Sequence, residues 1–225
     1  MMMLSNGNLR LLRGLTPFLL ASIAVLALSG CGIFSPDESD DGGGGTIQDD
    51  FKNTAVDEVS ANQGRDNVIA NLELAYELLN YEQYERLIHA DYVFRVDPNE
   101  VDIVGARELT AFEDLESTFA MFNGETGREP ILDAEGNPTG EEAIVPPVQR
   151  ITLDLDPETS AWIESSDPLF EGSFERIYRV TMTVTYSGDS RVDQIRGKQV
   201  FYVTPGTLQN DESGKLYWQL RAWED

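Results

Sequence analysis

The side chains that most often bind metals or act as nucleophiles are scarce in this chain, which has one cysteine, Cys31, and one histidine, His89. Zinc sites usually need three or four such ligands, and one cysteine cannot form an intramolecular disulfide. The segment around His89 reads as the end of a short helix, where a positive side chain is tolerated. We therefore expect a packing role for His89, and we expect no metal and no other cofactor.

Carboxylates are abundant, with 40 Asp and Glu residues, but they do not form a recognisable binding motif. Two short sets alternate with other residues: Asp154, Asp156 and Glu158, and Asp133, Glu135 and Asn137. Neither set has the glycine and final glutamate of an EF-hand loop, so a solvated acidic surface explains both. The chain also lacks a Gly-x-Ser-x-Gly elbow and a Gly-x-x-x-x-Gly-Lys loop, so acyl transfer and nucleotide binding lack their motifs.

The first thirty residues have the pattern of a secretory signal peptide. Arg10 and Arg13 precede an apolar run from Leu15 to Leu28, and small residues stand just before Cys31. The stretch Leu28-Ser29-Gly30-Cys31 closely resembles the bacterial lipobox. That resemblance implies a diacylglyceryl group on the Cys31 thiol, cleavage before Cys31 and acylation of the new amino terminus. The alternative is an uncut start-transfer helix, but the run is shorter than the roughly 20 residues of a membrane span.

Charge indicates how such a protein would sit at a membrane. Two of the 16 basic residues and none of the acidic ones lie before Cys31, so the mature part has 14 basic and 40 acidic residues and a formal charge of −26. Such a surface repels nucleic acid and anionic headgroups. We expect a cell-envelope protein that touches the membrane through the lipid on Cys31 and has no nucleic-acid partner. Gly32 after the cysteine, rather than Asp, resembles the outer-membrane sorting pattern of enterobacterial lipoproteins, which implies the outer membrane. The choice between a periplasmic and a surface-facing domain stays open.

Composition divides the chain into three parts. Residues 1–30 are the predicted signal peptide, and residues 31–65 hold the lipidated cysteine and a flexible acidic, glycine-rich tether. Residues 66–225 are the predicted folded domain. The weak periodicity of residues 47–62 allows either a short helix or more tether.

The first half of the folded domain reads as helical, with one strand. Apolar residues repeat at helical spacing from Val68 to Leu79, and Tyr84, Leu87 and Ile88 mark a second, shorter helix. Residues 91–98 read as a short strand. A further helix has a predicted apolar stripe of Leu109, Phe112, Leu115, Phe119 and Phe122. Residues 125–147 read as a loop.

The second half reads as strands, predicted at residues 148–155, 174–186, 195–204 and 216–223. The second of these alternates strictly between apolar and polar residues, as a half-buried strand does. Short connections between them predict an antiparallel meander, and the insert around Trp162 reads as a loop or short helix.

Helices followed by long antiparallel strands describe an α+β domain. The helix that ends at Leu79, the stretch from Leu87 to Phe94 and the closing stretch from Gly214 to Asp225 together resemble the nuclear transport factor 2-like superfamily, which includes SnoaL-like proteins and ketosteroid isomerases. The resemblance implies N-terminal helices packed against a curved, mainly antiparallel sheet, in a cystatin-like cone that encloses a pocket. It also allows a homodimer formed through the sheet.

Nine aromatic residues are candidates for lining that pocket, and each could instead simply fill the core. They are Tyr76, Tyr92, Phe94, Phe119, Phe122, Tyr178, Phe201, Tyr217 and Trp223.

Asp97 is the weak catalytic candidate, because the ketosteroid isomerases have an aspartate before a proline at the end of the first strand, and it removes a proton next to a carbonyl. Asp97-Pro98 occupies the matching place. Their enolate, however, is stabilised by a tyrosine near the position of Glu73 and by an aspartate on a late strand, and this chain has neither there. Without such stabilisation a base loses a large part of its catalytic effect, and Asp97 is also explained as a turn former before proline.

We therefore expect non-catalytic binding of a small apolar ligand or of an envelope protein. An isomerase or dehydratase that uses Asp97 is the alternative. A purely structural module, with its cone filled by side chains, is the third possibility.

Overall fold

A computed structural model describes residues 51–56, 59–96, 107–134, 137–209, 214 and 216–225. Two predicted sites, Cys31 and Asp97, lie outside these residues, so their predictions are untested.

The described helices begin at well-formed caps. Helix α2 spans Ala61–Glu77 and begins seven residues before the apolar repeat that starts at Val68, because the Ser60 side chain caps it by accepting a hydrogen bond from the backbone of Gln63. Helix α3 spans Tyr81–Leu87 and is capped by Asn80. Helix α5 spans Ala111–Phe122 and starts with a capping box between Thr110 and Glu113.

The main sheet has seven strands. Six follow the spatial order β2-β1-β9-β8-β7-β5, and β6 pairs with β7. Their bounds are β1 Ile88–Arg95, β2 Glu108–Thr110, β5 Val148–Pro157, β6 Ile163–Glu164, β7 Phe174–Tyr186, β8 Val192–Gln209 and β9 Leu216–Glu224. All described pairings are antiparallel except that between β1 and β9, which is parallel. The predicted meander of four long strands is thus confirmed as β5, β7, β8 and β9.

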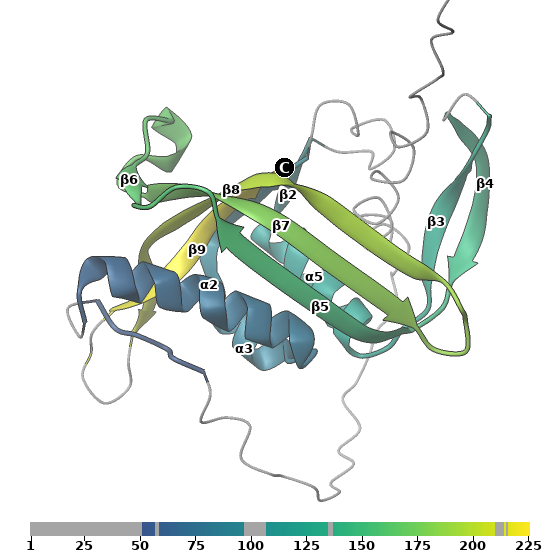
Figure 1. The fold of residues 1–225 in the computed structure, drawn as a ribbon, viewed down its shortest axis with the longest axis horizontal. Coiled ribbons are helices and arrows are strands. Elements are labelled where there is room, and N and C mark those ends of the chain that lie inside the picture. Colours follow the sequence, from purple (N-terminus) through teal and green to yellow (C-terminus); the bar gives the residue numbers. More distant parts are fainter. Residues whose placement is uncertain (1–50, 57–58, 97–106, 135–136, 210–213, 215) are drawn as a thin grey trace, which may run out of the picture.

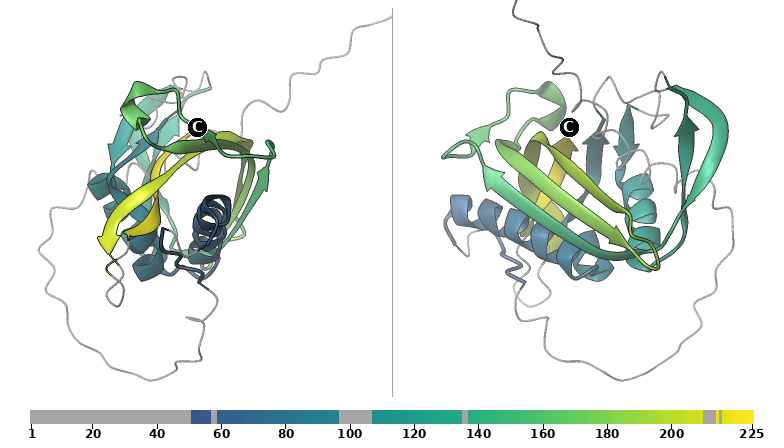
Figure 2. Two further views of the ribbon diagram at one scale, coloured as in Figure 1. Left: turned by 90° about the vertical axis from the view of Figure 1, so that its left-hand side faces the viewer. Right: turned by 45° about the vertical axis from the view of Figure 1, so that its right-hand side comes forward.

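The sheet curves around the helices. Figure 2 shows α2 lying along the concave side of the sheet, with α3 and α5 further along the same side. One large hydrophobic cluster fills the space between these helices and the sheet. The alternation predicted for β7 is confirmed, since Tyr178, Val180 and Met182 are buried and Arg179 is exposed. The predicted fold class, helices against a curved and mainly antiparallel sheet, is therefore confirmed.

The buried side chain of Gln219 joins the helical layer to the sheet. The Gln219 side chain of β9 donates hydrogen bonds to the carbonyls of Arg86 and Ile88, at the turn from α3 into β1. Gly206 of β8 lies directly against Gln219, and a Cβ atom there would fall 2.1 Å from Gln219 Oε1. Glycine is needed at residue 206 because any larger residue would displace this link.

The prediction of a loop over residues 125–147 is wrong. Strands β3, Gly127–Leu132, and β4, Pro138–Val145, form a separate two-stranded antiparallel sheet that projects from the end of the main sheet (Figure 1). The segment was misread because its strands are mostly exposed and contain Pro130 and Pro138. They lack the apolar alternation that marks a half-buried strand.

The helix-end role expected for His89 is also wrong, because strand β1 begins at Ile88. The imidazole is buried, and its Nδ1 accepts a hydrogen bond from the backbone of Asp91. Burial, together with Arg221, lowers the pKa of His89. His89 is therefore a packed, mainly neutral strand residue at pH 7.

The insert around Trp162 is short irregular structure, as expected. It holds β6 and a single 3₁₀ turn, η2, Pro168–Phe170. No helix among the described residues is long and apolar enough to cross a bilayer.

Candidate functional site

Seven of the nine pocket candidates meet in the interior between the helices and the sheet. They are Tyr76, Tyr92, Phe94, Phe122, Tyr178, Phe201 and Trp223, all at most 8% exposed. Ring contacts, mostly edge to face, link six of them: Tyr76, Phe94, Phe122, Tyr178, Phe201 and Trp223. The ring centroids of Tyr76 and Phe122 are 5.2 Å apart, and those of Phe94 and Trp223 are 5.7 Å apart. These aromatic residues therefore form a continuous packed cluster in the interior.

The other two candidates lie elsewhere. Phe119 is 46% exposed and packs against Tyr81 on the outside of the helices, with ring centroids 5.0 Å apart. Tyr217 is partly buried at the start of β9, where it pairs with Ala55. Neither contributes to the interior aromatic cluster.

Helix α5 is rotated relative to the sequence-based expectation. Of its predicted stripe, Leu109 and Phe122 are buried and Leu115 packs against the core, but Phe112 is 73% exposed and Phe119 is 46% exposed. Its buried residues are Asp114, Ser117, Thr118, Met121 and Phe122. At 3.6 residues per turn, Phe112 and Phe119 lie about half a turn away from Asp114. The helix thus buries three polar side chains beside its apolar ones and leaves two phenylalanines on its outer side.

Asp114 is the centre of a buried polar cluster. Its carboxylate Oδ2 accepts a hydrogen bond of 2.6 Å from the hydroxyl of Tyr84, which comes from α3. Burial raises the pKa of Asp114 to about 7, although the bond from Tyr84 opposes that rise. Asp114 therefore changes charge near neutral pH, unlike an ordinary surface aspartate.

Three further hydroxyl groups surround this pair, those of Tyr76 from α2, Tyr92 from β1 and Thr118 from α5. Burial raises the pKa of each of the two tyrosines, and the charge of Asp114 raises it further, so both stay protonated. The hydroxyl groups of Tyr92 and Thr118 lie beside those of Tyr84 and Tyr76, but neither makes a hydrogen bond of normal geometry. Among the described residues, they are buried polar atoms that still need a partner.

This cluster offers hydrogen-bonding groups suited to an oxygen-bearing group. Tyrosine and threonine hydroxyls both donate and accept, and Asp114 accepts when ionised and donates when protonated. A carbonyl or hydroxyl oxygen placed among them would meet the unsatisfied hydroxyls of Tyr92 and Thr118. A carboxyl group with a pKa near 7 is also suited to moving a proton at neutral pH. Binding and acid–base chemistry are both within reach of the geometry.

Sequence reasoning named Tyr76 and Tyr92 but missed Tyr84, Asp114 and Thr118. The missed signal was the spacing of Asp114, Thr118 and Phe122, which share one helical face. The apolar stripe one residue away obscured it. Tyr84 is 30 residues from Asp114 in the chain, and only the folded chain brings the two together.

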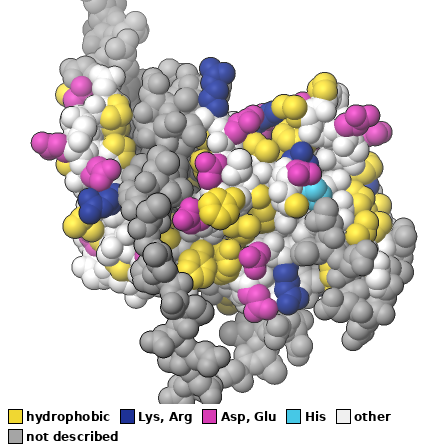
Figure 3. All heavy atoms as spheres, turned by 180° about the vertical axis from the view of Figure 1, so that it is seen from behind, with side chains coloured by type: hydrophobic (Ala, Val, Ile, Leu, Met, Phe, Trp, Pro, Cys, Tyr) yellow, Lys and Arg dark blue, Asp and Glu magenta, His cyan; other side chains and the backbone are white. Residues whose placement is uncertain are grey.

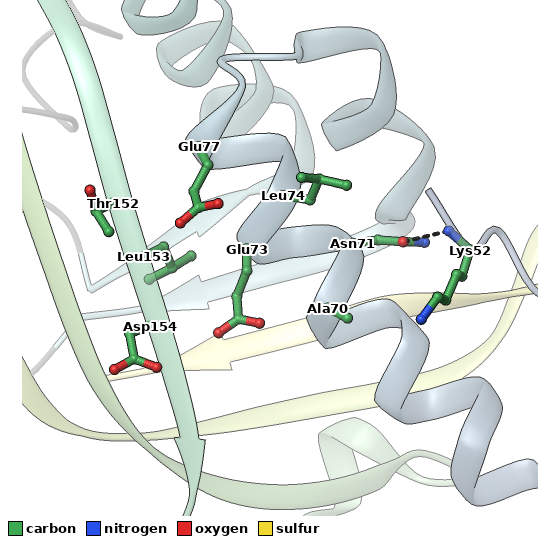
Figure 4. Close-up of a pocket in the computed structure, with 9 residues that line it drawn as sticks. All are labelled: Lys52, Ala70, Asn71, Glu73, Leu74, Glu77, Thr152, Leu153 and Asp154. Carbon is green, nitrogen blue, oxygen red and sulfur yellow. Dashed lines mark hydrogen bonds between the residues drawn. The ribbon is translucent and has the colours of Figure 1, made fainter. Parts of the chain in front are cut away.

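A second feature is an open groove of about 580 Å³ between α2 and β5. Figure 4 shows Glu73, Glu77 and Asp154 pointing into it, with Lys52 at the far end. Glu73 accepts a hydrogen bond of 2.6 Å from the backbone of Leu155, and burial raises its pKa. Glu73 therefore faces this groove, whereas Tyr76, three residues later, lies in the aromatic interior. Among the described residues, no group of three or more His, Cys, Asp or Glu side chains could hold a metal ion.

Fold and site together define a cone-like α+β domain with an aromatic interior and one buried polar cluster. No protein-family model matches the chain, and no curated protein matches it.

Several solved structures are similar to it. A conserved protein from Planctomyces limnophilus has 12% sequence identity and a TM-score of 0.46, with 72% of this chain and 92% of that one covered. A nuclear transport factor 2-like superfamily protein from Salmonella enterica serovar Typhimurium has 10% identity and a TM-score of 0.43, with 72% and 87% covered. A domain with a cystatin-like fold from Nostoc punctiforme has 12% identity and a TM-score of 0.40, with 74% and 76% covered.

Proposed function

We propose that this protein is a lipid-anchored envelope protein whose domain binds a small, mainly apolar ligand bearing one carbonyl or hydroxyl oxygen. The observation that carries the proposal is the pair of buried hydroxyls, Tyr92 and Thr118, which lie close to Asp114 and make no hydrogen bond of normal geometry with the hydroxyls of Tyr84 and Tyr76 beside them. Leaving such groups unsatisfied costs roughly 1–3 kcal/mol each. A ligand oxygen would recover that free energy, and the aromatic lining would contact the apolar part of the ligand.

The test is native mass spectrometry of the chain from residue 32 onward, purified without detergent from its own organism. We expect extra mass that disappears on denaturation and that identifies the ligand. The double variant Tyr92→Phe, Thr118→Val removes both hydroxyls and keeps the shape of the site. The fraction of its molecules that carry the extra mass should therefore be at least tenfold smaller than in the parent chain.

Tyr202→Phe is the matched control. Tyr202 is a buried tyrosine outside the aromatic interior, and its hydroxyl already donates to Glu224. This variant should keep the ligand. A protein that carries no extra mass, or a double variant that keeps it, would contradict the proposal.

Acid–base catalysis is the second candidate, and the raised pKa of Asp114 favours it. In this proposal, ionised Asp114 removes a proton next to a substrate carbonyl, and the hydroxyls of Tyr92 and Thr118 hydrogen-bond to the enolate oxygen that forms. Asp97, the base suggested by the family resemblance, stays a competing candidate.

A β,γ-unsaturated ketone is a suitable probe, because its isomerisation to the conjugated ketone is followed by ultraviolet absorbance. If Asp114 is the base, kcat/KM should rise with pH and level off above about 7, and Asp114→Asn should lower it at least a hundredfold. Asp97→Asn should leave it within twofold. Loss of turnover in Asp97→Asn alone would assign the base to Asp97. Undetectable turnover in the parent chain would contradict the proposal that the protein catalyses this isomerisation.

A further inference from the structure

The outward face of α5 is unusual because it exposes aromatic rings on a regular helix. Phe112 and Phe119 are seven residues apart, two helical turns, and therefore lie on one line along the helix. They are 73% and 46% exposed. Isolated exposed hydrophobic residues are common on proteins, but an aligned aromatic pair on a rigid helix is typical of a binding surface.

The neighbouring helix extends this surface. The ring of Tyr81 in α3 meets the ring of Phe119 at 85°, so the aromatic strip crosses from one helix to the other. The Tyr81 hydroxyl also donates to Glu85 of α3. We call Tyr81, Glu85, Phe112, Glu116 and Phe119 together the α3–α5 face.

Charge on this face is one-sided. Glu116 lies between the two phenylalanines on the helix surface, and Glu85 lies beside Tyr81. Neither glutamate forms an ion pair with a described basic residue, whereas the nearby Glu82 pairs with Arg86 at 3.2 Å. Figure 3, which shows the molecule from behind, has large hydrophobic side chains flanked by Asp and Glu side chains on the side where α5 lies.

We propose that the α3–α5 face binds a basic amphipathic segment of a partner protein. Such a segment would place apolar side chains against Phe112, Phe119 and Tyr81 and its Lys or Arg side chains near Glu85 and Glu116. The occupant follows from charge. A second copy would bring its own glutamates against these, an anionic membrane surface is repelled, and the tether at residues 35–50 carries six acidic residues and no basic one.

Binding can be tested with synthetic helical probes. The chain from residue 32 onward is titrated into a fluorescein-labelled peptide of 18 residues with leucines on one face and lysines on the other. A peptide with glutamates in place of the lysines is the charge control. Fluorescence anisotropy should show saturable binding of the lysine peptide at 150 mM salt, at least tenfold tighter than that of the glutamate peptide.

The variants separate a specific face from general attraction to an acidic protein. Phe112→Ser with Phe119→Ser keeps the charge and should weaken binding at least tenfold. Ile144→Ser with Ile163→Ser is the matched control, because these residues are 70% and 59% exposed elsewhere on the surface. The control should change the Kd less than twofold. Glu85→Gln with Glu116→Gln should weaken binding and flatten its salt dependence.

Three outcomes would overturn the proposal. The first is that both serine double variants lose binding equally, or that neither of them loses it. The second is a concentration-dependent dimer, seen by analytical ultracentrifugation, that only the phenylalanine variant dissociates, since the face would then be a self-interface. The third is equally phenylalanine-dependent binding to vesicles of phosphatidylethanolamine and phosphatidylglycerol, which would make it a membrane contact. None of these depends on Tyr92 or Thr118.

Discussion

Asp114 is the residue at which burial and function are most closely connected. Its carboxyl is buried with one hydrogen bond from Tyr84 and two unsatisfied hydroxyls nearby. An apolar residue would pack there without the cost of burying a charge. The helix therefore accepts a local loss of stability at the point where the proposed ligand binds, which is common at functional sites.

The raised pKa of Asp114 predicts how stability changes with pH. Between pH 4 and 7 the unfolded chain loses this proton and the folded chain keeps it, so the folded state binds more protons and stability falls as pH rises. The contribution should be about 1.4 kcal/mol per pH unit in this window and constant above about pH 7. Asp114→Asn removes the titrating carboxyl and with it this pH dependence. The free energy of unfolding of the variant should therefore rise relative to that of the parent chain from pH 4 to pH 7.

Urea unfolding followed by circular dichroism at pH 4, 5, 6, 7 and 8 measures this difference. Glu171→Gln makes the same carboxyl-to-amide change at an exposed position and should follow the parent chain at every pH. Parallel curves for Asp114→Asn and the parent would show that the folded state does not raise the pKa of Asp114.

Among the elements, the β3–β4 hairpin is joined to the main sheet by charged contacts. Arg191 donates two hydrogen bonds to Glu129 of β3, at 2.7 and 2.8 Å, and also pairs with Asp193 of β8. The side chains are 14–24% exposed, so the pairs are shielded from water more than ordinary surface pairs. They attach the hairpin to the main sheet.

Removing that arginine should release the hairpin. Arg191→Met leaves Glu129 and Asp193 partly buried without their shared cation, so the free energy of unfolding should fall by about 2 kcal/mol. Amide hydrogen exchange should accelerate across residues 127–145. Arg128→Met is the control, because the pair of Arg128 with Glu142 is 57% and 44% exposed and should matter by less than about 1 kcal/mol. Unchanged exchange in Arg191→Met would show that other contacts hold the hairpin.

For the whole molecule, the proposed location depends on Cys31. If this cysteine carries the lipids, Cys31→Ala should shift the protein from the membrane fraction to the soluble fraction, because the acidic domain is expected to be repelled by anionic headgroups. Fractionation and immunoblotting measure the shift, and Ser29→Ala is the control that keeps a small residue before the cysteine. If Cys31→Ala instead stays in the membrane fraction and a high-pH carbonate wash does not release it, the apolar run at residues 15–28 anchors the chain.

Much of the architecture could be predicted from the sequence, because the spacing of apolar residues along a helix or strand often shows which of its faces is buried. The alternation along β7 fixes which residues face the core, and the stripe from Val68 to Tyr76 fixes the buried side of α2. Long strands with short connections likewise implied the antiparallel order of β5, β7, β8 and β9.

The candidate site could not be predicted in the same way. Helix α5 has apolar residues on both sides, so its own period allows two orientations, and contacts with α3 and β1 decide between them. The chosen orientation buries Asp114 against Tyr84 and exposes Phe112 and Phe119. The sequence by itself determined the elements and most of their buried faces, which depend on neighbours a few residues away. Only the tertiary structure decided the polar cluster and the α3–α5 face, because both depend on contacts between segments about 30 residues apart or more.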